Sequence, residues 1–239
     1  MIIAHSKKFI LMSPWKTASS TCHASLGQYN ESVYPRFFYY NGFLNRVVTQ
    51  HATLADLTAL PEGKLGYKVA AFVRNPYDRA YSGFIQIQRD FQEQPKVEIE
   101  PAWITHLLRA QIATNMSRVI SAGFNFDAWI NLLPDYEVYE PGHNTNMVLH
   151  PCHYWTHVNG EQLVGFVGKV EQFEHDFHRF CDYVDIEPPV VQLSNVSEHE
   201  TEPTTGDTCK YAGRMSRRAL DRINELFAKD FELFGYDML

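Results

Sequence analysis

The 239-residue sequence has little cysteine. Its four cysteines, Cys22, Cys152, Cys181 and Cys209, are widely spaced and none forms a CxxC pair. This spacing excludes a dense disulfide scaffold and predicts reduced thiols. Long apolar runs are also missing, and the N-terminus lacks the small-residue cleavage pattern of a secretory signal peptide. We therefore expect a cytoplasmic protein without an integral membrane segment.

Positive charge is scarce as well. Lys and Arg number 21 against 28 Asp and Glu, and the formal net charge is −7. A broad basic surface for nucleic acid is therefore not expected, although a few local cations suffice for a small anion. The sequence also lacks the glycines of a Walker A loop, Gly-x-x-x-x-Gly-Lys-Ser/Thr, which argues against an ordinary nucleoside-triphosphate kinase.

What is present is the composition of a globular protein, with 45% hydrophobic and 21% charged residues. The length fits one domain over residues 1–239. Short apolar runs predict strands at 7–13, 46–49, 67–73, 163–167 and 190–193. Helical patterns and capping residues alternate with them, at 18–29, 53–60, 75–91, 102–117, 125–133, 170–184 and 216–231. This alternation predicts an α/β fold with a central, mostly parallel sheet flanked by helices, and with ligands at the carboxyl ends of its strands.

The first candidate ligand loop, residues 13–21, joins a predicted strand to a predicted helix. Backbone amides at a helix start attract anions, and Lys16 adds a cation. The hydroxyl groups of the loop could donate further hydrogen bonds to a phosphosulfate. The alternative is that its serines and threonines only cap the helix.

The second candidate loop begins at Arg74, directly after the most apolar strand. Asn75 and Pro76 are typical of a helix start. An Arg at a strand end can make two charge-assisted bonds to a phosphate, and Ser82 could add a hydroxyl from the same side. The alternative is a structural pair between Arg74 and Asp78.

Two stretches, Lys-Thr-Ala-Ser-Ser-Thr at 16–21 and Arg-Asn-Pro-Tyr-Asp-Arg-Ala-Tyr-Ser at 74–82, together resemble the sulfotransferases that use 3′-phosphoadenosine 5′-phosphosulfate (PAPS). The likeness is greatest to the Golgi-type carbohydrate sulfotransferases and their bacterial relatives. It continues through Val-Gly-Phe-Val-Gly-Lys-Val-Glu-Gln-Phe at 164–173 and the C-terminal Asp-Phe-Glu-Leu-Phe-Gly-Tyr at 230–236. The resemblance therefore spans nearly the whole chain in order.

This resemblance implies a P-loop-like three-layer fold and sulfuryl transfer from PAPS to an acceptor hydroxyl, on a carbohydrate or glycoconjugate, with PAP (3′,5′-ADP) as product. It implies that the first motif binds the 5′-phosphosulfate and the second the 3′-phosphate. A third cofactor loop is expected near 204–211. The implied cofactor-binding residues are Lys16, Thr17, Ala18, Ser19, Ser20, Thr21, Arg74 and Ser82.

Sulfuryl transfer resembles phosphoryl transfer in form, an in-line displacement in which positioning and charge stabilisation dominate. The acceptor hydroxyl must lose a proton, and a histidine near neutral pKa suits that task. His51 follows a predicted strand, and in the family a His at this place in the chain is a base. We therefore expect His51 and Lys16 to be catalytic; the alternative for His51 is a helix cap or an exposed side chain. No metal is expected.

Other patterns leave alternatives open. One histidine-rich stretch has no standard zinc spacing; its members could bind a metal or line the acceptor pocket. That stretch contains His143, His150, Cys152, His153 and His157. An acidic pair for hydrolysis could come from Asp127, Asp135, Glu137 and Glu140. The aromatic residues Phe37, Phe38, Tyr39, Tyr40 and Phe43 favour core packing, with sugar stacking as an alternative. A phosphotransferase with a divergent phosphate loop and a non-catalytic nucleotide-binding domain remain rival functions.

Overall fold

The computed structural model describes residues 1–36, 38–93, 99–135, 150–194 and 209–239. The described strands are β1 (Ile2–Ala4), β2 (Phe9–Met12), β3 (Tyr39–Asn41), β4 (Arg46–Val48), β5 (Lys68–Val73), β6 (His157–Val158), β7 (Glu161–Gln162) and β8 (Phe166–Lys169). The described α-helices are α1 (Ser19–Ser25), α2 (Leu54–Ala59), α3 (Pro76–Glu93), α4 (Ala102–Ser121), α5 (Phe126–Asn131), α6 (Phe173–Val184), α7 (Arg217–Leu226) and α8 (Ala228–Phe234). A short 3₁₀ helix, η4 (Cys152–Trp155), precedes β6.

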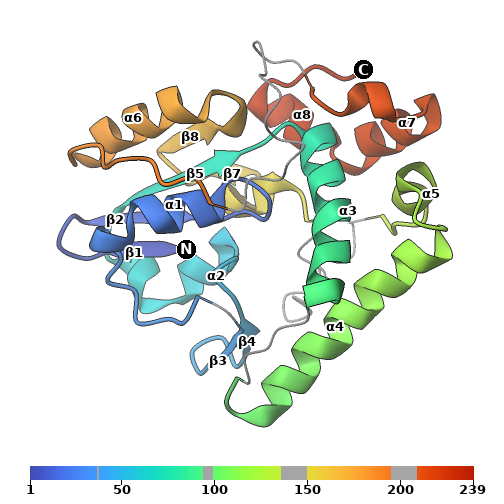
Figure 1. The fold of residues 1–239 in the computed structure, drawn as a ribbon. Coiled ribbons are helices and arrows are strands. Elements are labelled where there is room, and N and C mark those ends of the chain that lie inside the picture. The colour runs from blue at the N-terminus through green and yellow to red at the C-terminus, as the bar shows by residue number, and fades with distance from the viewer. Residues whose placement is uncertain (37, 94–98, 136–149, 195–208) are drawn as a thin grey trace.

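The central sheet has four strands in the order β1-β2-β5-β8. β2 pairs in parallel with β5, and β5 pairs in parallel with β8, whereas β1 lies antiparallel to β2. The expected mostly parallel α/β sheet is therefore confirmed (Figure 1). Because β2 and β5 are parallel neighbours, the loops that leave them start on the same edge of the sheet.

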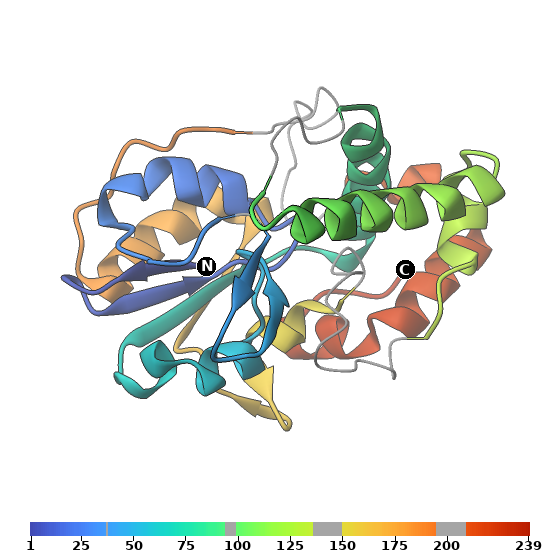
Figure 2. The same cartoon turned by 90° about the horizontal axis from the view of Figure 1, so that it is seen from below.

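Both faces of this sheet are buried, because consecutive side chains of a strand point to opposite faces. Phe9 and Leu11 of β2 and Phe72 of β5 pack with residues of α1 and α6. Ile10 and Ala71 pack on the other side with residues of α2 and η4. Figure 2 shows α1 and α6 on one side of the sheet and α2 on the other. Helices thus cover the sheet from both sides.

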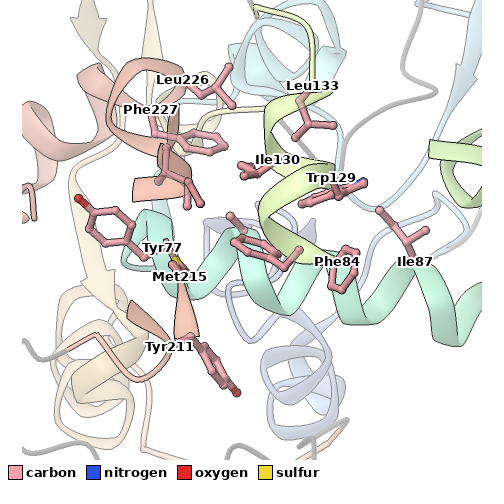
Figure 3. Close-up of a cluster of buried hydrophobic side chains, with 14 of the residues drawn as sticks. Tyr77, Phe84, Ile87, Trp129, Ile130, Leu133, Tyr211, Met215, Leu226 and Phe227 are labelled. Carbon is pink, nitrogen blue, oxygen red and sulfur yellow. The ribbon is translucent and has the colours of Figure 1, made fainter. Parts of the chain in front are cut away.

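A third cluster of buried side chains joins α3, α5 and the C-terminal helices. Phe84 of α3 packs against Trp129 of α5, and Tyr77 of α3 packs against Phe231 of α8. Phe227, which follows α7, belongs to the same cluster (Figure 3). This helical core packs α3 against Val73 at the end of β5. Since Ser82 lies on α3, the core also fixes the position of that side chain.

Several expected elements differ from the structure. β1 was not predicted, because three apolar residues give too short a pattern. The strand expected at 163–167 is β8, displaced toward the C-terminus. The strand expected at 190–193 is wrong: this segment has no strand, and Val190 is 84% exposed. The helix expected at 216–231 is two helices, because Phe227 leaves helical geometry with φ −120° and ψ 23°.

The strand expected at 46–49 exists as β4, but it does not join the central sheet. It pairs antiparallel with β3 to form a separate hairpin. The helix after it begins at the predicted Thr53, whose hydroxyl caps the Asp56 amide while the Asp56 carboxylate accepts from the Thr53 amide. This capping box satisfies two amides at the start of α2. It sets the direction of the chain directly after His51.

Candidate functional site

Two loops meet at the carboxyl edge of the central sheet. Ser13 follows β2 and Arg74 follows β5, and these two strands are hydrogen-bonded neighbours. Both side chains are buried, with Arg74 only 7% exposed. The structure therefore brings the two sequence motifs together at the edge where open α/β sheets bind ligands.

The first loop has an unusual backbone. Lys16 and Ala18 both adopt left-handed geometry, with φ of 63° and 59°. Such conformations are disfavoured for residues with a Cβ, so surrounding contacts must hold them. The Thr17 hydroxyl supplies one of these contacts by donating to the Pro14 carbonyl at 2.9 Å. The Ser13 hydroxyl is buried and has no hydrogen-bond partner among the described residues. A buried donor of this kind suits a ligand oxygen.

Lys16 reaches from this loop to α3. Its ammonium donates to the Gln86 side-chain oxygen at 3.0 Å, and the Gln86 amide donates to Asp90 at 2.6 Å. Burial raises the pKa of Asp90 above its ordinary value. Ser82, Gln86 and Asp90 are spaced by four residues and therefore share one face of α3. Lys16 thus contacts the helix face that carries Ser82.

Two other hydroxyl groups of the first motif, those of Thr21 and Ser20, have partners within the protein. Thr21 donates to the Ser194 carbonyl at 3.3 Å and accepts from the Ser194 amide at 3.2 Å. Ser20 accepts from the Arg36 guanidinium at 3.0 Å. Ser19 starts α1, and Ala18 is its N-cap position without a side-chain cap. In this structure Thr17 and Thr21 hold the loop in shape.

The second loop is anchored through its polar residues. The Asn75 side-chain oxygen accepts from the Tyr77 backbone amide, as expected for a helix cap. The Asn75 backbone amide donates to the Glu171 carboxylate at 2.7 Å. The Asp78 carboxylate accepts from the Cys209 thiol at 2.9 Å and from the amides of Lys210 and Tyr211. Asp78 therefore holds the end of the expected third loop beside Arg74. Residues 204–208 of that loop lie outside the described residues.

His51 lies beside the first loop. Its Nδ1 is 2.6 Å from the Ser13 carbonyl oxygen, so Nδ1 carries the proton and donates. The indole of Trp155 donates to the His51 carbonyl at 3.0 Å. Burial, together with the smaller effects of the Met1 amino group, Arg36 and Lys16, lowers the pKa of His51 to about 3. His51 is therefore neutral, with its proton on the side of Ser13.

Sequence reasoning placed His51 at the end of a strand, which is correct, but it gave no sign that this strand lies outside the central sheet. It also missed the neighbours of His51. Gln50 Nε2 lies 3.2 Å from His51 Nε2, and Arg36 donates to the Gln50 side-chain oxygen at 2.9 Å. In the sequence, only its position next to His51 could have indicated that Gln50 belongs to the site. No sequence feature indicated that Arg36 does.

The histidine-rich stretch is largely tied to α8. The Asp230 carboxylate, only 1% exposed, accepts from the amides of Cys152 and His153 and lies 2.8 Å from His153 Nδ1. Burial lowers the pKa of His150 to about 4. In the parts of the chain that the structure describes, no three His, Cys, Asp or Glu side chains form a group that could hold a metal. His143 lies outside those parts.

The acidic residues and the aromatic residues considered as alternative sites make their own contacts elsewhere in the protein. Asp127 accepts from the Ser216 amide at 3.0 Å, and Asp135 pairs with Arg222, so each carboxylate has its own partner near α7. Glu137 and Glu140 lie outside the described residues, as does Phe37 of the aromatic group. Tyr40 packs edge-on against Trp103, with ring centres 6.3 Å apart and both side chains 48% exposed.

Comparison with known protein families identifies the chain. The model of the sulfotransferase family matches residues 16–237, nearly the whole sequence. The chain therefore belongs to the sulfotransferase family and is a PAPS-dependent transferase. A comparison with curated proteins and one with solved structures returned no match. In the described residues, no helix is long and apolar enough to cross a membrane.

Proposed function

We propose that this protein transfers the sulfuryl group of PAPS to a hydroxyl of a carbohydrate or glycoconjugate, by in-line displacement with His51 as general base. The observation that carries the proposal is the convergence of three segments. The Ser13 carbonyl, after β2, accepts from His51 Nδ1. The Lys16 ammonium donates to Gln86, one turn after Ser82 on α3. Arg74 directly follows β5, the strand that pairs with β2. The proximity of the residues that the resemblance assigns to the donor and to the base supports this proposal.

The donor site fits a phosphosulfate nucleotide. Residues 16–21 would hold the 5′-phosphosulfate, and Arg74 and Ser82 the 3′-phosphate. Left-handed residues help to turn successive amides toward one side, as in anion-binding nests. The buried Ser13 hydroxyl and the buried Arg74 guanidinium supply donors that water does not compete for. The donor set is cationic and neutral, which matches a highly anionic ligand.

PAPS supplies an activated sulfuryl group whose leaving group is a phosphate oxygen. Lys16 offsets the charge that develops on that oxygen, and the loop amides hold the reacting centre in line. His51 accepts the proton of the acceptor hydroxyl at Nε2, while the Ser13 carbonyl keeps the Nδ1 proton in place. The negative charge of a bound donor would offset the nearby cations and raise the pKa of His51 toward the range useful for a base.

Further features belong to the same proposal. Helices on both faces of the sheet and the loop between β2 and α1 support a P-loop-like three-layer fold, with residues 1–239 as a single domain. The net charge of −7 supports a small anionic donor without a nucleic-acid partner. We also propose a cytoplasmic enzyme that needs no metal. The half-exposed Tyr40 and Trp103, on the hairpin and α4, offer aromatic surface that suits a sugar ring.

The test is calorimetric titration of the protein with 3′,5′-ADP, with 5′-AMP and ATP as controls. Tight binding that requires the 3′-phosphate is expected. Transfer of radiolabelled sulfate from PAPS to a panel of glycans, phenols and simple alcohols then identifies the acceptor class. Preference for ATP, or the absence of nucleotide binding, would remove the donor assignment. Transfer to phenols alone would remove the carbohydrate assignment.

A further inference from the structure

A chain of hydrogen bonds leads from Arg36 to the proposed base. Arg36 Nε donates to the Gln50 side-chain oxygen at 2.9 Å, Gln50 Nε2 lies 3.2 Å from His51 Nε2, and His51 Nδ1 lies 2.6 Å from the Ser13 carbonyl. A second nitrogen of Arg36 donates to Ser20 at 3.0 Å. This path of hydrogen bonds therefore connects α1, the segment before the β3–β4 hairpin and the first loop.

The direction of every bond in this chain is determined by its ends. A guanidinium can only donate, so the group of Gln50 that faces it is the carbonyl oxygen, and the Gln50 amide must face His51. A backbone carbonyl can only accept, so His51 must donate from Nδ1. The Ser13 end requires a proton on Nδ1, and the Gln50 end requires an unprotonated Nε2. Together the two requirements select the neutral Nδ1-protonated imidazole.

We propose that Arg36 and Gln50 are positioning residues that hold His51 as the neutral tautomer with a free electron pair on Nε2. A proton on Nε2 would face the Gln50 amide, donor against donor. Gln50 cannot turn its amide over without placing that amide against Arg36 Nε. Arg36 therefore acts through Gln50, and the imidazolium form is disfavoured until something displaces the Gln50 amide.

This geometry gives Gln50 a second task, which rests on the proposed function. The acceptor hydroxyl must reach His51 Nε2, where the Gln50 amide now lies. Gln50 thus marks the position of the acceptor hydroxyl and is displaced when the acceptor binds. Through Ser20, the same guanidinium also contacts the loop proposed for the phosphosulfate, so donor binding and the placement of the base are coupled.

Other charges around His51 must be separated from this effect. The charges of Arg36 and Lys16 lower the pKa of His51, and the Met1 amino group does so when it is protonated. Burial lowers the pKa of that amino group to about 5, and burial lowers the pKa of His23 of α1 to about 3, so both groups are neutral near pH 7. Arg36→Lys keeps the charge of residue 36 but replaces the planar fork, which bonds Gln50 and Ser20 at once, by a single ammonium. Gln50→Glu keeps the size of residue 50 but presents a carboxylate that accepts from a protonated Nε2.

The experiment is nitrogen-15 NMR of the histidine rings in the full-length protein, with the His51 signals assigned by comparison with His51→Asn. In the wild type we expect a protonated Nδ1, an unprotonated Nε2 and no titration of His51 down to pH 5. Gln50→Glu should raise the pKa of His51 by at least about one unit, so that it titrates above pH 5. Arg36→Lys should allow the Nε2-protonated tautomer to appear. Gln162→Glu, on an exposed strand, is the matched control and should leave His51 unchanged.

A wild-type His51 protonated on Nε2, or a Gln50→Glu protein that folds with unchanged His51 titration, overturns the proposal. An Arg36→Lys protein with unchanged tautomer removes Arg36 from it. These readouts need neither donor nor acceptor, so they remain distinct from a failure of nucleotide binding, which would remove the proposed function instead. In the active enzyme, Gln50→Glu should move the acidic limb of the kcat–pH profile to higher pH, whereas a merely structural role would lower kcat at every pH.

Discussion

At the scale of single residues, His51 has the properties of a base that stays neutral. Its Nδ1 proton is held by the Ser13 carbonyl, and burial lowers its pKa to about 3. A lowered pKa favours the unprotonated form at every pH above that value. The free protein therefore keeps a proton acceptor at this position across the physiological range.

Replacing His51 by Ala should lower kcat by about 10²- to 10⁴-fold, the usual contribution of a general base. Affinity for 3′,5′-ADP should stay near that of the wild type, because His51 contacts the loop through the Ser13 carbonyl only. Steady-state kinetics and calorimetry on the same preparation measure both. His178→Ala, on the exposed face of α6, is the control; full activity of His51→Ala would move the base to another residue.

Arg74→Ala should weaken binding of 3′,5′-ADP by about 10- to 100-fold, since a buried charge-assisted contact to phosphate contributes about 1.5–3 kcal/mol. Binding of 5′-AMP should change little, because it lacks the 3′-phosphate. Calorimetric titration of both nucleotides measures the difference. Arg218→Ala, an exposed side chain on α7, should not alter either affinity. An equal loss for both nucleotides would contradict the assignment of Arg74 to the 3′-phosphate.

At the scale of elements, α3 organises the site. It starts directly after β5, carries Ser82 toward Lys16, and packs through Tyr77 and Phe84 into the helical core. Asp78 in its first turn collects three donors from residues 209–211. One helix thus positions parts of the site that lie far apart in the sequence.

Asp78→Asn should destabilise the protein by about 1–3 kcal/mol, because an amide replaces a carboxylate among buried donors. It should also weaken 3′,5′-ADP binding, since the segment ending at Tyr211 would lose its attachment beside Arg74. Urea unfolding and calorimetry measure the two effects. Asp221→Asn removes an exposed pair with Arg217 and should cost less than about 1 kcal/mol. If the two variants behave alike, the anchoring role of Asp78 is wrong.

At the scale of the whole molecule, three buried or partly buried histidines link stability to pH. The pKa of His23 and of His51 is lowered to about 3, and that of His150 to about 4, mainly by burial. Their ordinary value is 6.5, so the unfolded chain binds more protons than the folded one between that pH and about 4. The stability that these groups contribute is present above pH 6.5 and is lost as the pH falls.

The free energy of unfolding should therefore fall between pH 6.5 and 4, by up to about 1.4 kcal/mol per pH unit for each of the three histidines. Urea unfolding at a series of pH values measures the slope. His23→Phe should make the slope shallower, because one proton fewer is taken up on unfolding. His106→Gln, an exposed histidine on α4, should leave it unchanged. Stability independent of pH in this window would contradict the burial of neutral histidines.

The sequence by itself determined the elements with strong local patterns. These are the apolar runs of β2 and β5, the Asn75-Pro76 start of α3 and the Thr53 cap of α2. Each depends on residues only a few positions apart, so each can be recognised from the sequence alone. The two loop motifs and the order of sheet and helices follow from these elements. The resemblance of the sequence motifs to known sulfotransferases predicted the family, and the family match confirms that prediction.

Only the tertiary structure decided which polar groups meet. The pairing of β1 with β2, the separation of β4 from the central sheet, and the contacts of Asp78 with residue 211 and of Asp230 with His153 join residues with no common local pattern. The same holds for the path from Arg36 through Gln50 to His51, where each bond direction depends on the next. Local sequence sets backbone preferences, whereas long-range packing sets which buried donor finds which acceptor.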